Sequence, residues 1–197
     1  MRTIFEFFLV IVAVLSLSAC ASILRSDFAG DVRHSDLRTA ALNVKPIGHI
    51  EYGNGRNIKI GMDSPLIAGE TLKGRFEVVS IQGTQGQPYA ITVVAICDCL
   101  GFRKWTVVPD AYLLDHEGKT VTQGTVISPT HRYITGTFPR DGEYKVLVLA
   151  DANHEGEKVG SISAWLPGGG LTSGFLDIPK RSHPTGIVQV SYPKTAP

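Results

Sequence analysis

The chain has 197 residues, 43% of them hydrophobic, and its 19 Lys and Arg balance 18 Asp and Glu to a net charge of +1. A nearly neutral chain without a block of Lys and Arg lacks the basic surface that binds nucleic acid, so we expect no partner of that class. The length suits one domain large enough to bury a hydrophobic core.

The N-terminal segment carries a targeting pattern. Arg2 precedes an apolar run over residues 7–17, and Leu17-Ser18-Ala19-Cys20 closes it. This pattern resembles that of bacterial lipoprotein precursors, in which a peptidase cuts before the cysteine and lipid is attached to it. An ordinary cleaved signal and a membrane anchor are the alternatives, but the run is shorter than the roughly 20 apolar residues of a spanning helix.

The resemblance implies a signal peptide over residues 1–19 and a lipidated tether over residues 20–45. Cys20 would carry a diacylglycerol (palmitate-type) thioether and an acylated amine, and several acyl chains anchor a protein stably. Ala21 and Ser22, rather than Asp, follow the cysteine. By the sorting rule of the lipoprotein class, this implies the outer membrane, facing the periplasm.

The tether is polar, with mixed charges. Leu24, Phe28, Val32 and Leu37 form a ragged helical stripe in it. We expect a partly ordered spacer, although the stripe could dock on the domain.

Residues 46–197 show the pattern of a single all-β domain, because short β-branched and aromatic runs alternate with Gly, Pro, Asn and Asp. We expect about eight strands, drawn from six clear and four weaker runs, in an antiparallel two-sheet sandwich of jelly-roll-like type. The candidate strands are residues 47–52, 58–60, 72–81, 89–98, 105–114, 120–126, 133–138, 144–150, 161–166 and 187–192. The expected turns are residues 83–86, 115–118 and 140–142, the last of these a strong hairpin signal.

The stretch from Thr130 to Asp151 contains Phe138-Pro139-Arg140-Asp141-Gly142-Glu143-Tyr144. It resembles the last hairpin of pre-peptidase C-terminal domains and, less specifically, maltose-operon periplasmic proteins. The resemblance implies an accessory or binding module that has no catalytic residues.

Cys97-Asp98-Cys99 ends a clear strand, and residues i and i+2 of a strand point to the same face. Three interpretations stay open: a disulfide, two buried thiols, or a metal or redox site. Extended geometry separates the two α-carbons by about 6.5 to 7 Å, so a bridge requires a kink. A metal site requires a further ligand, and His116, His131 or His154 are the candidates.

Residues 151–156 resemble the opening of a calcium loop, but Ile162 stands where the bidentate carboxylate belongs, so we expect a polar turn and no metal. No Gly-x-Ser-x-Gly, Ser-x-x-Lys, His-Glu-x-x-His or phosphate-binding glycine motif is present in the sequence. We therefore expect no enzyme, no catalytic residue and no cofactor.

Four aromatic residues are candidates for ligand binding: Trp165, Trp105, Tyr112 and Tyr133. Aromatic rings stack on sugars, whereas tryptophans of a β-sandwich most often fill its core. We expect residues 167–184 to form a long loop that folds over the domain or contacts a partner.

The sequence thus favours an outer-membrane lipoprotein acting as a non-catalytic accessory or scaffold module for an envelope protein partner. Envelope glycan binding is the alternative, and a thiol or metal site at Cys97 and Cys99 is the third hypothesis.

Overall fold

The structure is a computed structural model that describes residues 32–99, 104–166 and 174–194. The residues from Arg33 onward belong to one compact unit, which is described below. The folded unit starts at Arg33 rather than at residue 46, so part of the expected tether belongs to the domain. The signal segment and Cys20 lie outside the described residues.

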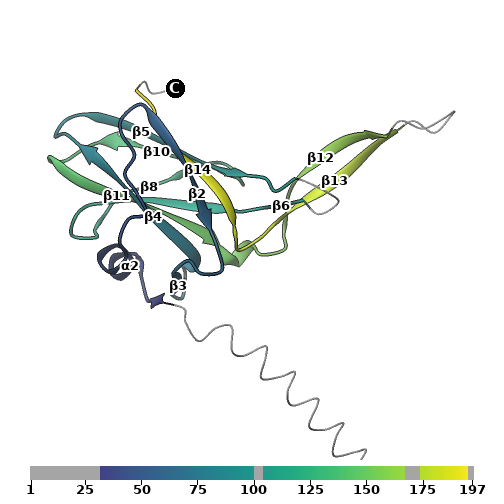
Figure 1. Ribbon diagram of the computed structural model, residues 1–197, viewed down its shortest axis with the longest axis horizontal. Coiled ribbons are helices and arrows are strands. Elements are labelled where there is room, and N and C mark those ends of the chain that lie inside the picture. Colours follow the sequence, from purple (N-terminus) through teal and green to yellow (C-terminus); the bar gives the residue numbers. More distant parts are fainter. Residues whose placement is uncertain (1–31, 100–103, 167–173, 195–197) are drawn as a thin grey trace, which may run out of the picture. The chain divides into compact units, whose positions relative to one another are not determined.

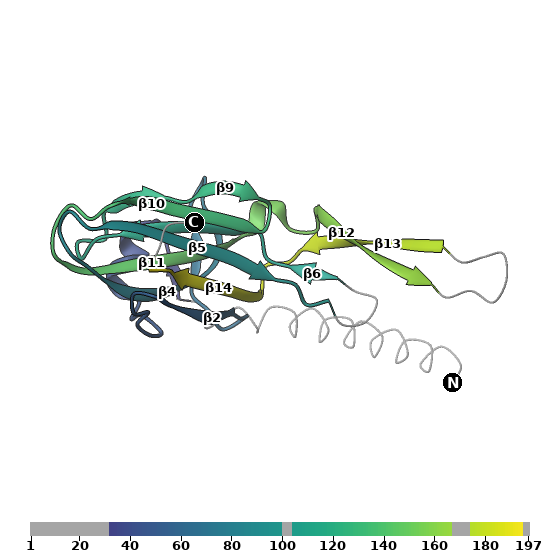
Figure 2. The ribbon, with the colours of Figure 1, turned by 90° about the horizontal axis from the view of Figure 1, so that it is seen from above.

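Two β-sheets pack face to face, and a smaller third sheet adjoins them (Figures 1 and 2). The first sheet has the order β1-β3-β4-β11-β7-β8, the second β2-β14-β5-β10-β9 and the third β12-β13-β6. The strands are β1 (Arg33–His34), β2 (Asn54–Ile60), β3 (Leu66–Ala68), β4 (Lys73–Gly83), β5 (Pro88–Ile96), β6 (Trp105–Thr106), β7 (Pro109–Leu114), β8 (Thr120–Gln123), β9 (Thr125–Ser128), β10 (His131–Thr137), β11 (Gly142–Asp151), β12 (Lys158–Leu166), β13 (Gly174–Ser182) and β14 (Gly186–Tyr192).

The predicted all-β sandwich is confirmed, and its strands alternate in burial as expected. In β14 the side chains of Val188 and Val190 are buried between the sheets, whereas Ile187 and Gln189 are exposed. Long antiparallel ladders join the strands within each layer, such as β11 with β4 in the first sheet and β14 with β5 in the second. Two short pairs are parallel instead, β1 with β3 and β6 with β13.

The number of strands exceeds eight, because two predicted strands are divided and β1, β3 and β13 fall outside the candidate strands. Residues 105–114 form β6 and β7, and residues 120–126 contribute to β8 and β9, which belong to different sheets. Residues 47–52 form no strand of their own. They carry an isolated parallel bridge from His49 to Ser80 in β4.

The turn at residues 140–142 does not make a hairpin, contrary to expectation. β10 pairs with β5 and β9 in one sheet, whereas β11 pairs with β4 and β7 in the other. The Tyr144 hydroxyl donates to the Arg140 carbonyl at 2.8 Å and fixes this corner. The turn after β7 does make a hairpin, because β7 pairs with β8.

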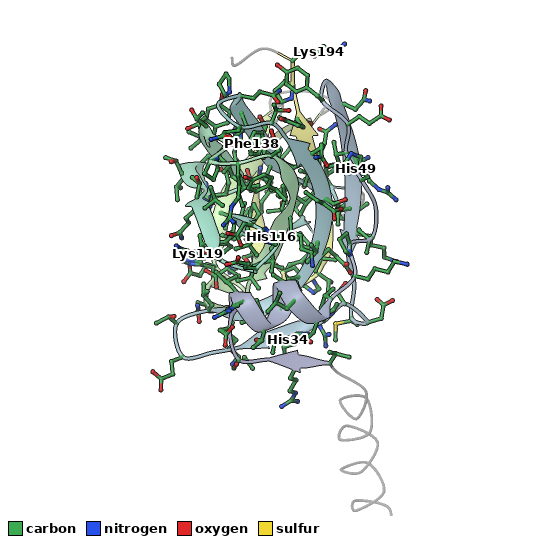
Figure 3. The ribbon with its side chains drawn as sticks, turned by 90° about the vertical axis from the view of Figure 1, so that its left-hand side faces the viewer. His34, His49, His116, Lys119, Phe138 and Lys194 are labelled. Atoms are coloured by element: carbon green, nitrogen blue, oxygen red, sulfur yellow. A yellow bond between two sulfur atoms is a disulfide. The ribbon has the colours of Figure 1, made fainter. Side chains whose placement is uncertain are left out.

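The middle strands of the first sheet are buried on both faces, because helix α2 (Leu37–Asn43) covers part of its outer side (Figure 3). Ala40 and Ala41 are fully buried in a cluster with Phe76 and Tyr112. The Asp36 side chain caps the helix by accepting from the Thr39 backbone N–H at 2.8 Å. The segment that was expected to be a tether thus supplies part of the hydrophobic cluster between α2 and the first sheet.

Part of the loop that was expected over residues 167–184 is a strand of the third sheet, because β13 covers Gly174–Ser182; residues 167–173 lie outside the described part of the chain. β13 pairs with β12 along its length, from Arg181 opposite Lys158 to Gly174 opposite Leu166. The antiparallel pair of β12 and β13, called the ribbon below, extends away from the two main sheets (Figures 1 and 2). The apolar residues of β13 therefore belong to a strand whose backbone pairs with that of β12.

Candidate functional site

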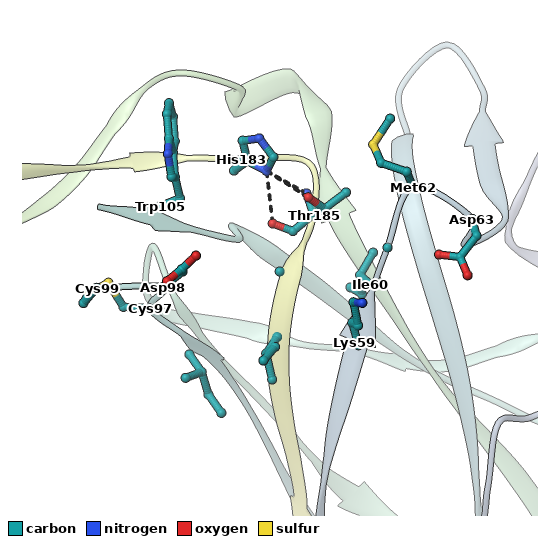
Figure 4. A pocket seen from close by; sticks show the side chains of 14 residues that line it. Lys59, Ile60, Met62, Asp63, Cys97, Asp98, Cys99, Trp105, His183 and Thr185 are labelled. Atoms are coloured by element: carbon teal, nitrogen blue, oxygen red, sulfur yellow. Dashed lines mark hydrogen bonds between the residues drawn. A yellow bond between two sulfur atoms is a disulfide. The ribbon is translucent and has the colours of Figure 1, made fainter. Parts of the chain in front are cut away.

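A pocket of about 540 Å³ lies where the ribbon joins the second sheet (Figure 4). It is lined by residues from β2, β5, β6 and β14 and from the segments that follow or precede them. Figure 4 shows Trp105, Asp98 and the Cys97–Cys99 bridge on one side, with Lys59, Met62 and Asp63 on the other. The pocket therefore joins two features that the sequence analysis treated separately, the paired cysteines and Trp105.

Trp105 is positioned by backbone hydrogen bonds to the turn at Asp98. The Asp98 N–H donates to the Trp105 carbonyl at 2.9 Å, and the Trp105 N–H returns a bond of 3.3 Å. On its other side Trp105 pairs in parallel register with Arg181 of β13. Its half-buried ring lies 5.2 Å from that of His183, with 57° between the planes.

Three large apolar side chains line the pocket yet stay exposed to solvent: Met62 by 61%, Ile187 by 43% and Ile96 by 38%. Ile96 and Ile187 are direct neighbours across β5 and β14, and Lys59 pairs with Ile187 from β2. Exposed apolar side chains gathered at one hollow are typical of interaction sites, whereas single ones are ordinary.

Cys97 and Cys99 are joined by a disulfide, with 5.2 Å between their α-carbons. This distance is shorter than the roughly 6.6 Å spanned by two steps of an extended strand, so the chain bends here. β5 accordingly ends at Ile96. Both cysteines are half-buried and line the pocket.

The loop that carries Met62 and Asp63 is anchored by Glu77 of β4. The Ser64 hydroxyl donates to the Glu77 carboxylate at 2.5 Å and accepts from the Gly61 N–H at 2.9 Å. The pKa of Glu77 is raised, chiefly because burial disfavours the charged carboxylate. The hydrogen bond from Ser64 lowers the pKa, and the negative charge of Asp63 raises it. The anchor holds one wall of the pocket in place.

The other predicted aromatic residues do not line this pocket. Tyr112 is only 4% exposed and packs under α2, so the suggestion that it forms a ligand platform is wrong. Tyr133 is half-buried and faces Thr92 and Thr125 in the second sheet. The side chain of Trp165 lies outside the described residues.

The calcium-like segment at residues 151–156 forms a short 3-10 helix (Ala152–His154). The Asp151 carboxylate accepts from the Asn153 N–H at 2.9 Å, and the His154 ring contacts the Glu157 carboxylate at 2.9 Å. The polar side chains of this turn therefore bond to one another. The hydrogen bond that the His154 ring donates to the Glu157 carboxylate raises the pKa of His154, burial lowers that pKa, and the negative charge of Asp151 raises it.

Among the residues that the structure describes, no group of three or more His, Cys, Asp or Glu side chains could hold a metal ion. The histidine that lies at the pocket with the cysteines is His183, not one of the three candidates named from the sequence. Across the same residues no helix has the length and apolarity needed to cross a membrane.

Several pocket residues were not singled out from the sequence. Ile96 and Ile187 had a usable signal, because each is an apolar residue at the solvent-facing position of an alternating strand. His183 and Met62 had none, since the pairing of β13 with β6 and the anchoring of the Met62 loop on β4 are long-range contacts.

The chain matches no family model and no curated protein. A search of solved structures finds the pre-peptidase C-terminal domain of collagenase from Bacillus anthracis, with 12% identity and a TM-score of 0.40 over 76% of this chain and 98% of that one. It also finds PliG of Salmonella Typhimurium, a periplasmic inhibitor of g-type lysozyme, with 11% identity and a TM-score of 0.24 over 74% and 98%. Both TM-scores lie below 0.5, so the function has to be inferred from this chain's own residues.

Proposed function

We propose that the protein is an envelope lipoprotein, anchored through Cys20 to the outer membrane on its periplasmic face, whose β-sandwich binds a protein partner without catalysing a reaction. The proposed anchor is supported by the Leu17-Ser18-Ala19-Cys20 motif. The proposed binding site is the pocket at the base of the ribbon.

The observation that carries this proposal is the exposure of Met62, Ile96 and Ile187 around one hollow that Trp105 also lines. Leaving such side chains in water forgoes about 25 cal/mol for each Å² of apolar surface that a partner would cover. Aromatic residues and Met are enriched at protein interfaces, and a half-buried Trp is a typical anchor residue. Lys59, Asp63 and Asp98 add a polar rim of mixed charge.

The test is a cross-linked pull-down from the envelope, comparing the native chain with Ile187→Glu and Cys20→Ala. Ile127→Glu is the matched control, because Ile127 is 57% exposed on the edge strand β9, away from the pocket lining. We expect native protein and the Ile127 variant to recover one protein complex, and the Ile187 variant to lose it. Equal recovery with the native chain, Ile127→Glu and Ile187→Glu would place the interface elsewhere and overturn the proposal.

Glycan binding is a second candidate, supported by the Trp105 and His183 rings at the pocket. Apolar faces of sugars stack on aromatic rings, and the Lys59 and Asp98 side chains supply hydrogen-bond partners for hydroxyl groups. This candidate predicts that purified cell-wall glycan sediments with the native chain and not with Trp105→Ala. Sedimentation with neither would exclude it.

A further inference from the structure

We propose that the Cys97–Cys99 disulfide exchanges with the thiol of a polypeptide held in the pocket, so that protein and partner become joined by a mixed disulfide. The inference rests on the proposed binding function and adds the chemical class of the partner, a segment with a cysteine beside an apolar side chain.

The first observation is the position of the bridge. Cys97, Asp98 and Cys99 line the pocket, and Ile96, which directly precedes them, supplies one of its exposed apolar side chains. A polypeptide that places an apolar side chain against Ile96 and Ile187 therefore brings its neighbouring residues to the bridge. Access of the attacking thiol is a condition for disulfide exchange, and both cysteines are only half-buried.

The second observation is that the bridge closes a very short loop. Only Asp98 lies between the cysteines, so the disulfide constrains one bend and links no distant parts of the fold. The stabilisation that a disulfide provides by restricting the unfolded chain falls as the loop shortens. The bend is also held by the two hydrogen bonds between Asp98 and Trp105, which do not depend on the sulfur atoms. The bridge can thus open while the pocket wall keeps its backbone pairing.

The third observation concerns the charged side chains near the two cysteines. The Lys104 ammonium donates a hydrogen bond to the Cys99 carbonyl oxygen, which places a positive charge next to Cys99. A neighbouring cation stabilises a thiolate and makes that sulfur the better leaving group. The negative charge of the Asp98 carboxylate disfavours a thiolate at either cysteine. Cys97 is therefore the sulfur that the partner attacks, and Cys99 is the one that leaves.

The exchange balances without an added oxidant or reductant. The partner's thiol loses its proton to water, and its sulfur forms a bond to the Cys97 sulfur as the Cys97–Cys99 bond breaks. The electron pair of that bond leaves on Cys99, whose thiolate takes a proton from water. One disulfide is consumed and one is formed.

The experiment uses the full lipidated chain in detergent and three probes: a synthetic peptide with one cysteine flanked by leucines, the same peptide with serine in place of cysteine, and glutathione. Intact-mass measurement follows formation of the mixed disulfide. We expect the leucine peptide to form the adduct about tenfold faster than glutathione, the factor that roughly one buried aliphatic contact provides. Ile187→Glu should abolish the advantage of the leucine peptide over glutathione, whereas Ile127→Glu, which lies outside the pocket lining, should alter neither rate. Lys104→Gln should slow both thiols.

Absence of any adduct would overturn the inference, and so would equal rates for the leucine peptide and glutathione in the native chain. The serine peptide separates this inference from the proposed function. If the serine peptide binds and the cysteine peptide forms no adduct, the binding site stands and the exchange is wrong. If the serine peptide does not bind and both thiols react alike, both proposals are wrong.

Discussion

Asp98 and Trp105 exchange two backbone hydrogen bonds, which join the bend after β5 to the short strand β6. This backbone pairing places the Trp105 indole ring at the same pocket as the disulfide. The parallel pairing of β6 with β13 places the indole ring beside His183. The residues of the pocket wall are thus held by the backbone. Side-chain changes there should alter binding more than folding.

Replacing Trp105 tests this separation directly. We expect Trp105→Ala to weaken binding of the leucine-flanked serine peptide by about tenfold or more, as loss of an aromatic anchor does, while the free energy of unfolding falls by about 1 kcal/mol because the ring is only half-buried. Trp105→Phe should retain most of the affinity. Calorimetric titration and urea unfolding measure the two quantities, and an alanine variant that binds like native protein would remove Trp105 from the site.

Removing the disulfide should have a small effect on stability. The loop between Cys97 and Cys99 is so short that the chain-entropy model gives a loss of about 1.5 kcal/mol for the double substitution Cys97→Ser, Cys99→Ser. Urea unfolding of this variant, beside native protein with and without a reducing agent, measures the change. A loss several times larger would mean that the bridge is needed for the fold and would argue against its opening in function.

The docking of α2 on the first sheet should be sensitive to volume. Ala41 is fully buried, so Ala41→Leu should overpack the interface and lower the free energy of unfolding by about 1–3 kcal/mol. Leu42, the next residue, is 50% exposed, and Leu42→Ala should change stability by less than about 0.5 kcal/mol. Thermal unfolding of both variants makes the comparison, and equal effects would contradict the observed orientation of the helix.

Glu77 should make stability depend on pH in a defined direction. Its folded-state pKa is raised by burial above the ordinary value of 4.5, so the folded protein favours the protonated carboxyl. Native stability should therefore fall as the pH rises from 4.5 through the raised pKa, and then stay level.

Glu77→Gln keeps an oxygen that accepts from Ser64 but cannot ionise, so it should not show this fall. Urea unfolding of native protein and variant from about pH 4 to about pH 8 provides the test. Two parallel stability curves would show that ionisation of Glu77 does not contribute.

The two turns show what local sequence can predict and what it cannot. Residues 115–118 and 140–142 carry similar turn chemistry, yet the first joins paired strands and the second joins β10 to a strand of the opposite sheet. A turn residue sets the local backbone angles. Which strand lies beside which is decided by the burial of faces across the whole domain, and that information is spread over residues far apart in the chain.

The same limit applied to Tyr112. Tyr112 lies on the face of β7 opposite to Ala111 and Leu113, which are buried between the sheets. That face would be open to solvent in a bare two-layer sandwich. Helix α2 covers it, and the polar, charged sequence around the helix gave only a weak apolar stripe to indicate docking.

The sequence by itself determined the all-β class, most strand positions and the inward and outward faces of the strands, because a period of two residues is a local property of the chain. Tertiary structure alone decided that Cys97, Trp105, His183 and Ile187 share one pocket. These residues are brought together by the pairing of β6 with β13, whose partners are 76 residues apart, and of β14 with β5, whose partners are 91 to 99 residues apart. No local pattern specifies such pairings, since they follow from the choice of sheet partners that buries the most apolar surface in one core.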